Sequence, residues 1–407
     1  MLKKQLSYRK SIVKHLYFSG PLSSGELSER VGKSLPLVTK VLNSLMEEGS
    51  VIDTGLAPST GGRRRSMYSL KPDVMYIVSV AMDQFITRIA ILDLHNKLVR
   101  DIEKFELSLE KNPGALSRLT EKIAQVIQAS GIEHEKIVGV GIGMPGFVDS
   151  LKGVNYSFLE VPDDSISEYI GSRIHLPVFI DNDSSLIALA ELRFGAARGR
   201  RSAMVINIGW GVGLGLILGG ELFRGNNGFA GEFSHLPLFN NNKLCSCGKS
   251  GCLETEASLL VVIDKVMDGI KNGEITTLSH LPVGNVDQAV IDIISAAKKG
   301  DKFAVRLLSE AGYSIGRGVA ILIHLLNPEI IVLSGRGSTA GKIWQAPIQQ
   351  ALNEHCIPKL ASGTEVSLSA LGYSAEIIGA AALVMENYEK DTKRGHGKKA
   401  PHTHIQV

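Results

Sequence analysis

The chain has 407 residues, of which 44% are hydrophobic and 21% charged, and its formal net charge is +3. This length suggests two or three domains, and the composition excludes a wholly disordered protein. No stretch reaches the roughly 20 apolar residues of a membrane helix, because the nearest, 204–220, contains Asn207 and several glycines. Four cysteines are too few for a disulfide scaffold, and the basic N-terminal residues are followed by no apolar signal segment. We therefore expect a cytoplasmic protein without membrane insertion.

The charge is unevenly distributed along the chain. Residues 1–75 contain 12 Lys and Arg against 6 Asp and Glu, and residues 390–407 contain 5 against 1. Because the whole chain has a net charge of +3, residues 76–389 carry −7. A basic head on an acidic body indicates a polyanion-binding module joined to a domain of another kind. The basic tail, 390–407, is predicted to be disordered.

The head, 1–72, is predicted to contain three helices followed by a two-stranded ribbon. Ser23 and Glu26 have the spacing of a capping box at the start of the second helix, which should end at Gly32. Ser34 is the expected N-cap of the third helix. The apolar residues of that helix recur at helical spacing: Val38, Val41, Leu42 and Leu45. Two helices joined by a three-residue turn have the spacing of a helix-turn-helix.

Two groups of residues in the head are candidate DNA contacts. The start and exposed face of the third helix present short polar or cationic groups: Ser34, Pro36, Thr39, Lys40 and Asn43. The loop between strands at 51–52 and 67–70 holds paired glycines and then Arg63, Arg64 and Arg65, and such a tip can enter a narrow minor groove. Together they predict a winged helix-turn-helix that binds double-stranded operator DNA. The alternative is a protein-contact domain with a solvated basic loop.

From residue 76 onward the pattern predicts an α/β body made of two similar halves. The first half is expected to contain strands at 76–82, 87–92, near 97–106, 136–142 and 178–180, and helices at about 114–130 and from Asp183 through 196. The second is expected to contain strands at 203–208, 214–218 and 330–333, and helices at 258–270, 286–298 and 302–326. A duplicated α/β fold predicts a cleft between its halves, where ligands usually bind.

A cluster of cysteines in the second half indicates a metal site. Cys245, Cys247 and Cys252 lie within eight residues of one another, and His235 precedes them. Three thiolates and an imidazole make a closed tetrahedral Zn²⁺ site, which leaves no open position for catalysis. The alternative is three buried or redox-sensitive cysteines. The fourth, Cys356, is expected to be a core residue.

These features together resemble the ROK family of repressors, uncharacterised frames and sugar kinases. The resemblance rests on four segments: GIGMPGFVD (141–149), DNDSSLIALAE (181–191), NIGWGVGLGLILGGELFRGNNGFAGEFSH (207–235) and CSCGKSGCLETEAS (245–258). It implies an actin/hexokinase-like (ribonuclease H-like) duplicated body, and the head resembles the winged helix of the N-acetylglucosamine, glucose and xylose repressors. The implied lobes are 73–195, with 375–389 returning to it, and 196–374, which carries the zinc loop.

The resemblance also implies a sugar site. It assigns the hydrogen bonds to pyranose hydroxyls to Asn182, Asp183, Glu232 and Glu254, with His235 at the border between this pocket and the zinc site. A carboxylate can accept hydrogen bonds from two vicinal hydroxyls at once, so such residues suit a sugar. From the residue pattern alone, Asp181, Asp183 and Glu232 are equally well explained as solvated loop charges.

The sequence departs from the kinase members of this family at the nucleotide motifs. The kinases have Asp-x-Gly-Gly-Thr where this chain has Asp83-Gln84-Phe85-Ile86-Thr87, so two bulky apolar residues replace the glycines that approach phosphate. Trp210 stands in the second phosphate turn, and the adenosine-side glycine pair reads Ser334-Gly335-Arg336-Gly337. Asp183 matches the family's catalytic base. A base without a phosphoryl donor has nothing to transfer, so we expect a sugar sensor and no enzyme.

The sequence therefore predicts a sugar-responsive transcriptional repressor. Its expected partners are an operator and a monosaccharide or sugar phosphate, and helix-turn-helix proteins commonly bind as dimers, so a homodimer or a dimer of dimers is expected. One alternative is an active ATP-dependent sugar kinase with a regulatory head. Another, implied by the family, is a repressor sequestered by a sugar-transporter protein.

Overall fold

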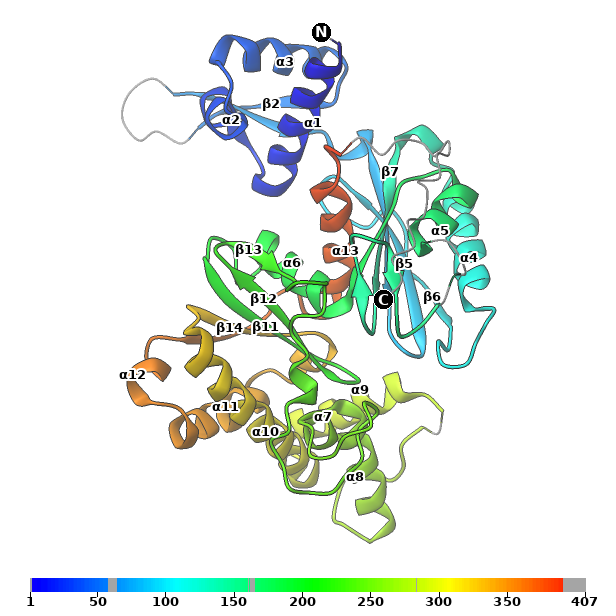
Figure 1. Ribbon diagram of the computed structural model, residues 1–407, viewed down its shortest axis with the longest axis vertical. Helices are drawn as coiled ribbons and strands as arrows, with labels where there is room; N and C mark the ends of the chain where they lie inside the picture. The colour runs from blue at the N-terminus through cyan, green and yellow to red at the C-terminus, as the bar shows by residue number, and fades with distance from the viewer. Residues whose placement is uncertain (1, 58–63, 160, 162–164, 283, 391–407) are drawn as a thin grey trace, which may run out of the picture.

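The computed structural model describes residues 2–57, 64–159, 161, 165–282 and 284–390. A small head lies at one end of the molecule, next to the first of two α/β lobes, and the second lobe lies at the other end (Figure 1). No helix in these ranges is long and apolar enough to cross a membrane. The tail predicted to be disordered lies almost entirely outside the described residues.

The head combines helices with a small antiparallel sheet in the order β1-β3-β2. Its elements are α1 (Leu2–Ser19), β1 (Leu22–Ser23), α2 (Ser24–Val31), α3 (Leu35–Glu47), β2 (Val51–Leu56) and β3 (Ser66–Leu70). The predicted capping box is present, with the Ser23 hydroxyl accepting from the Glu26 amide, and α2 ends at Gly32, whose φ is 65°. Ser34 is the N-cap of α3, although its side chain makes no capping hydrogen bond. The four predicted apolar residues of α3 are buried.

The first lobe is built on a mixed sheet in the order β10-β7-β4-β5-β6. Its elements are β4 (Tyr76–Met82), β5 (Ile86–Asp93), β6 (Glu103–Glu106), α4 (Ala115–Ser130), β7 (Ile137–Met144), β8 (Val148–Asp149), β9 (Val154–Asn155), α5 (Ile166–Ile174) and β10 (Val178–Asn182). Alternate residues of a strand point to opposite faces. Accordingly Val78 and Val80 of β4 join the core beneath α4 and α5, while Ile77 and Ala81 join the core shared with the head.

The second lobe repeats this arrangement in a sheet of order β13-β12-β11-β14-β15, which confirms the predicted duplication. Its strands are β11 (Ser202–Ile208), β12 (Val212–Leu218), β13 (Glu221–Phe223), β14 (Ile330–Ser334) and β15 (Glu365–Leu368). Its helices are α7 (Glu254–Ala257), α8 (Leu259–Lys271), α9 (Val286–Lys298), α10 (Lys302–Leu326), α11 (Lys342–His355) and α12 (Pro358–Ala361). In both sheets three antiparallel strands are followed by two parallel ones.

Two helices lie between the sheets. α13 (Ala375–Glu386) packs on β4 and β7, and α6 (Asp183–Phe194) packs on β11 and β12. A side chain at Gly141 would lie 2.0 Å from the Ala380 carbonyl oxygen, and one at Gly379 equally close to the Leu186 carbonyl oxygen. These glycines therefore allow α13 to approach both β7 and α6. The predicted boundary between the lobes at residue 195 remains a proposal, because α6 comes before this boundary in the sequence and yet packs on the sheet of the second lobe.

The head is seated on the first lobe and on α13. Apolar residues of α1 and α3 share one continuous core with β4, β5 and α13. Lys14 forms an ion pair with Glu386 at 3.3 Å, and the Tyr17 hydroxyl hydrogen-bonds to Asn96 Oδ1 at 2.5 Å. The ring of Phe18 packs against that of Phe194, with centroids 5.9 Å apart. The head is therefore joined to the body by packed side chains as well as by the chain itself.

Candidate functional site

A cavity of about 400 Å³ lies between the two lobes. Its walls come from the end of β10 and the start of α6, from the turn between β11 and β12, and from the segments around Phe233–His235 and Glu254. The residues assigned to sugar binding all line it: Asn182, Asp183, Glu232, His235 and Glu254. The fold thus brings together side chains from distant segments of the sequence, and their contact with a sugar remains a prediction.

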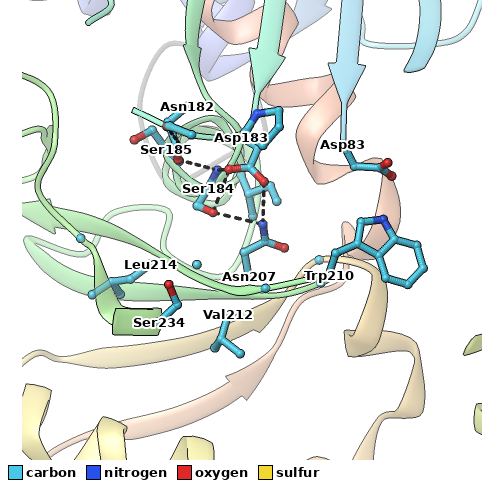
Figure 2. Close-up of a pocket in the computed structure, with 18 of the residues that line it drawn as sticks. Asp83, Asn182, Asp183, Ser184, Ser185, Asn207, Trp210, Val212, Leu214 and Ser234 are labelled. Carbon is cyan, nitrogen blue, oxygen red and sulfur yellow. Dashed lines mark hydrogen bonds between the residues drawn. The ribbon is translucent and has the colours of Figure 1, made fainter. Parts of the chain in front are cut away.

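Asn182 and Asp183 are positioned by the first turn of α6. The Asn182 side-chain oxygen accepts from the amides of Ser184 and Ser185 at 2.9 and 3.2 Å, as an N-cap does, and its nitrogen donates to the Gly146 carbonyl oxygen at 3.1 Å. Asp183 Oδ1 accepts from the Ser184 amide at 2.7 Å, and Oδ2 accepts from Asn207 Nδ2 at 3.3 Å (Figure 2). These contacts fix the Asp183 carboxylate at the floor of the cavity.

The protein around Asp183 changes its acidity. The side chain is open to the cavity yet densely surrounded, and this desolvation raises the pKa of Asp183 to about 6, against the opposing effect of the hydrogen bonds from Ser184. Burial likewise raises the pKa of Glu232, with His235 opposing the shift. A carboxylate with a pKa near neutral can accept a proton from a hydroxyl group more readily than an ordinary aspartate can.

The predicted metal ligands converge in a loop beside the cavity. One ligand atom from each of His235, Cys245, Cys247 and Cys252 lies within 4.8 Å of all the others. His235 Nδ1 is 3.4 Å from Cys245 Sγ, and the Sγ atoms of Cys247 and Cys252 are 3.7 Å apart. Tetrahedral Zn²⁺ with Zn–S bonds of about 2.3 Å places its sulfurs about 3.8 Å from one another, so this arrangement fits zinc. Cys356 is buried elsewhere in the core of the second lobe, as expected.

His235 lies between the metal cluster and the cavity. Its Nδ1 atom faces the cysteines, whereas Nε2 is 3.7 Å from Glu232 Oε2. A metal-bound histidine commonly presents its second nitrogen to a carboxylate, which fixes the orientation of the ring. Glu254, two residues after Cys252, lines the cavity and accepts from the Ser246 hydroxyl at 3.5 Å. The residues that could hold zinc are therefore continuous with two of the predicted sugar ligands.

At the positions where this chain departs from the kinase motifs, side chains of the two lobes contact one another. Asp83 at the end of β4 pairs with Arg336, which follows β14, at 2.8 Å. The rings of Phe85 and Trp210 meet edge to face with centroids 6.0 Å apart, and the Arg336 guanidinium lies 4.1 Å from the Trp210 ring centre. Figure 2 shows Asp83 and Trp210 together on one side of the cavity, apart from Asn182 and Asp183. These side chains join the two lobes across the cleft.

Sequence reasoning missed the residues that complete this contact. Arg88, Tyr373 and Glu376 line the cavity, and Arg88 donates to the Tyr373 carbonyl oxygen and to Glu376. No local motif marks them, because each becomes important only through a partner distant in sequence. Arg336 could have been found from the sequence, because it is a long cationic residue within the altered glycine pair.

The candidate DNA contacts lie on the outer side of the head. Four of them, Pro36, Thr39, Lys40 and Asn43, line a shallow open groove along α3 together with Leu35, Ser44 and Glu47. Ser34, Arg64 and Arg65 are exposed, and Arg63 lies outside the described residues. The order of helices and strands is the one that a winged helix-turn-helix requires, and DNA binding by these residues remains a prediction.

Comparison with known proteins identifies the family of this chain. The sequence model of the ROK family matches residues 87–387. The chain belongs to the ROK family. A glucokinase from Halalkalibacterium halodurans is 32% identical over 305 residues, which cover 72% of this chain and 91% of that protein. The xylose repressor of Caldicellulosiruptor bescii is 28% identical over 377 residues, which cover 90% of this chain and 92% of the repressor.

A solved structure matches this ROK protein along nearly its whole length. A ROK family transcriptional regulator, described as a homologue of the Escherichia coli MLC protein, superposes with a TM-score of 0.76 at 26% identity and covers 95% of this chain and 97% of that one. The predicted actin/hexokinase-like architecture of the body is confirmed by this likeness to ROK regulators and kinases. The match to the glucokinase covers less of the chain than the matches to the regulators do.

Proposed function

We propose that this ROK protein is a sugar-responsive transcriptional repressor. The observation that carries the proposal is a cavity lined by side chains suited to sugar hydroxyls, together with altered nucleotide motifs whose Arg336 and Trp210 pack against each other in its wall. The likeness to a transcriptional regulator extends over 95% of the chain, head included, and supports the same conclusion. A monosaccharide or sugar phosphate in the cavity would act as effector, and the head would bind the operator.

The head supplies the groups that DNA binding needs. The exposed face of α3, with Thr39, Lys40 and Asn43, is the proposed recognition surface in the major groove, as in other winged helix-turn-helix proteins. Arg64 and Arg65, with Arg63, form the proposed minor-groove contact of the wing. We further propose that two heads bind paired half-sites, as a homodimer or a dimer of dimers.

The sugar site and the metal site act together in this proposal. Asn182, Asp183, Glu232 and Glu254 would hydrogen-bond the sugar hydroxyls, and His235 would contribute from its metal-bound position. Zn²⁺ held by His235 and the three cysteines would supply a fixed crosslink in the loop. That crosslink would hold the loop beside Glu254 in one conformation, and it has no open position for catalysis.

Asp183 and the likeness to a glucokinase also support a second candidate, an ATP-dependent sugar kinase with a regulatory head. The raised pKa of Asp183 suits a base that takes a proton from a sugar hydroxyl. Against it stands the cleft, where the altered motifs present Phe85, Trp210 and Arg336. A coupled assay with purified protein, Mg-ATP and a panel of hexoses separates the two, and turnover abolished by Asp183→Asn would establish the kinase.

The central test measures release from DNA. An operator fragment is first selected from random or genomic DNA with the purified zinc-loaded protein, and its affinity is then measured by fluorescence anisotropy with and without each sugar. We expect at least one sugar to lower the affinity, and Lys40→Ala to weaken binding with or without sugar. Failure to select any DNA would refute the repressor proposal. If none of the sugars releases the protein from DNA but a sugar-transporter domain does, the effector is a protein partner and not a free sugar.

A further inference from the structure

We propose that the cavity selects an uncharged monosaccharide and rejects sugar phosphates and nucleotides, with Arg336 as the residue that closes it to phosphate. The inference rests on the proposed sugar site and narrows its ligand class. A phosphate group is normally held by arginine or lysine side chains and by free amides at a helix N-terminus. Within the described residues, the two arginines that line the cavity and the N-terminus of α6 are already engaged by the protein.

Arg336 is held by two carboxylates, a tyrosine hydroxyl and two aromatic rings. Gly335, at φ 78°, turns the chain after β14 and directs Arg336 toward the first lobe. Its guanidinium forms ion pairs with Asp83 and Asp287 and donates to the Tyr373 hydroxyl at 2.7 Å. The rings of Trp210 and Tyr373 lie 4.1 and 4.6 Å from it, and its side chain is only 11% exposed. The two carboxylates neutralise the single positive charge of Arg336, so the group has no net positive charge with which to attract a phosphate.

The second arginine of the cavity, Arg88, is engaged in the same way. One of its nitrogens donates to the Tyr373 carbonyl oxygen at 2.9 Å, another donates to Glu376 at 3.0 Å, and the group stacks 3.7 Å from the Tyr373 ring centre. Its side chain is 5% exposed. Arg88 therefore supports Tyr373 and α13, and these contacts hold its guanidinium against the protein.

The N-terminus of α6, at the cavity, is also occupied. The first amides of α6, on Ser184 and Ser185, are hydrogen-bonded by the side chains of Asn182 and Asp183. An anion at this position would have to displace the carboxylate of Asp183. The acidic side chains that remain around the cavity, Asp183, Glu232 and Glu254, suit hydroxyl donors and repel a phosphate.

The test compares each free sugar with its phosphate. Isothermal titration calorimetry of the full-length zinc-loaded protein would use glucose, mannose, fructose and N-acetylglucosamine, the 6-phosphate of each, xylose, and Mg-ATP. We expect one free sugar to bind at least about 100-fold more tightly than its own 6-phosphate, because like charges meet in the cavity. We also expect no heat from Mg-ATP.

A gain-of-function variant tests the role of Arg336. The double substitution Asp83→Asn with Asp287→Asn leaves the guanidinium without its carboxylates, and we expect the preference for free sugar over its phosphate to fall about tenfold or more. Asp292→Asn is the matched control, since it lies on the same helix, α9, and among the described residues its carboxylate accepts a hydrogen bond from Gln288 of that helix at 2.8 Å. The wild-type comparison does not depend on the folding of the variant.

The outcomes separate this inference from the proposed function. Tighter or equal binding of a sugar phosphate would overturn the inference and leave a sugar-binding regulator in place. Binding of Mg-ATP to the wild-type protein would overturn it as well. An unchanged preference in a folded double variant would remove Arg336 from the explanation. Binding of none of these ligands would refute the sugar site itself.

Discussion

Helix α13 runs from the cavity to the head, and we expect Lys14→Glu to weaken the effect of sugar on operator binding. Glu376, in the first turn of α13, lines the cavity and pairs with Arg88, while Glu386, its last residue, pairs with Lys14 of α1 and with Arg193. The two glutamates are ten positions apart in the sequence, which corresponds to about 15 Å along a helix. A ligand-driven shift at one end of α13 would therefore reach α1 at the other.

The size of the effect follows from the exposure of this ion pair. The side chains of Lys14 and Glu386 are 22% and 25% exposed, so solvent partly screens them and the pair contributes about 0.5–1 kcal/mol. Charge reversal removes this attraction and adds repulsion of similar size, for a total of about 1–2 kcal/mol. If α13 carries the coupling, the ratio of operator affinities with and without sugar should fall by a factor of about 5 to 30.

The assay is operator affinity, by fluorescence anisotropy, without sugar and at a saturating concentration of it. Arg306→Glu provides the control, because it reverses the charge in an exposed ion pair with Glu274 in the second lobe. Sugar affinity, measured by calorimetry, should be similar in the control and the wild type. A Lys14→Glu protein that keeps the wild-type ratio within about twofold would refute coupling through this contact.

Three further outcomes are expected. Cys252→Ser should lose about one equivalent of zinc by elemental analysis and melt at a lower temperature, and full zinc content would mean that the ligands are misassigned. Asp183→Asn should stabilise the fold by roughly 1–3 kcal/mol at about pH 7.5. The pKa of Asp183 is about 6 in the folded protein against 3.8 for the ordinary group, so the ionised carboxylate destabilises the fold increasingly as the pH rises between these two values. The stabilisation by Asp183→Asn, measured by urea titration, should therefore be smaller at about pH 4.5 than at about pH 7.5. Replacing Arg64 and Arg65 by Ala should reduce the slope of log operator affinity against log salt concentration by the amount expected for about two phosphate contacts. An unchanged slope would mean that the wing does not contact the DNA backbone.

Local patterns in the sequence were sufficient for most of the fold. The capping box at Ser23, the buried stripe of α3 and the long helix α10 depend on neighbouring residues, and all three agree with the prediction. Short elements such as β13, β15 and α5 were not predicted. Strands of three or four residues carry too little periodicity, and α5 begins with a single capping serine, Ser165.

The candidate site was predictable only where residues share a motif. The metal ligands form a compact motif, and the structure brings all four together. The contact around Arg336 was not foreseen, because its partners, Asp83, Asp287 and Tyr373, lie far from it in the sequence and on different elements. Ion pairs of this kind depend on how the two lobes meet, and no helix or strand period reports that geometry.

Strand β4 connects the same two regions as α13. On one face, Ile77 and Ala81 pack in a core that also holds Leu16 of α1 and Ala381 of α13. Immediately after the strand, Asp83 holds Arg336 of the second lobe. Protein interiors are close-packed, so a change in lobe spacing that pulls on Asp83 must be accommodated along β4 or in the core that seats the head. A sugar that binds one lobe spacing better than another would thereby favour one position of the head, which is the condition that control of operator binding requires.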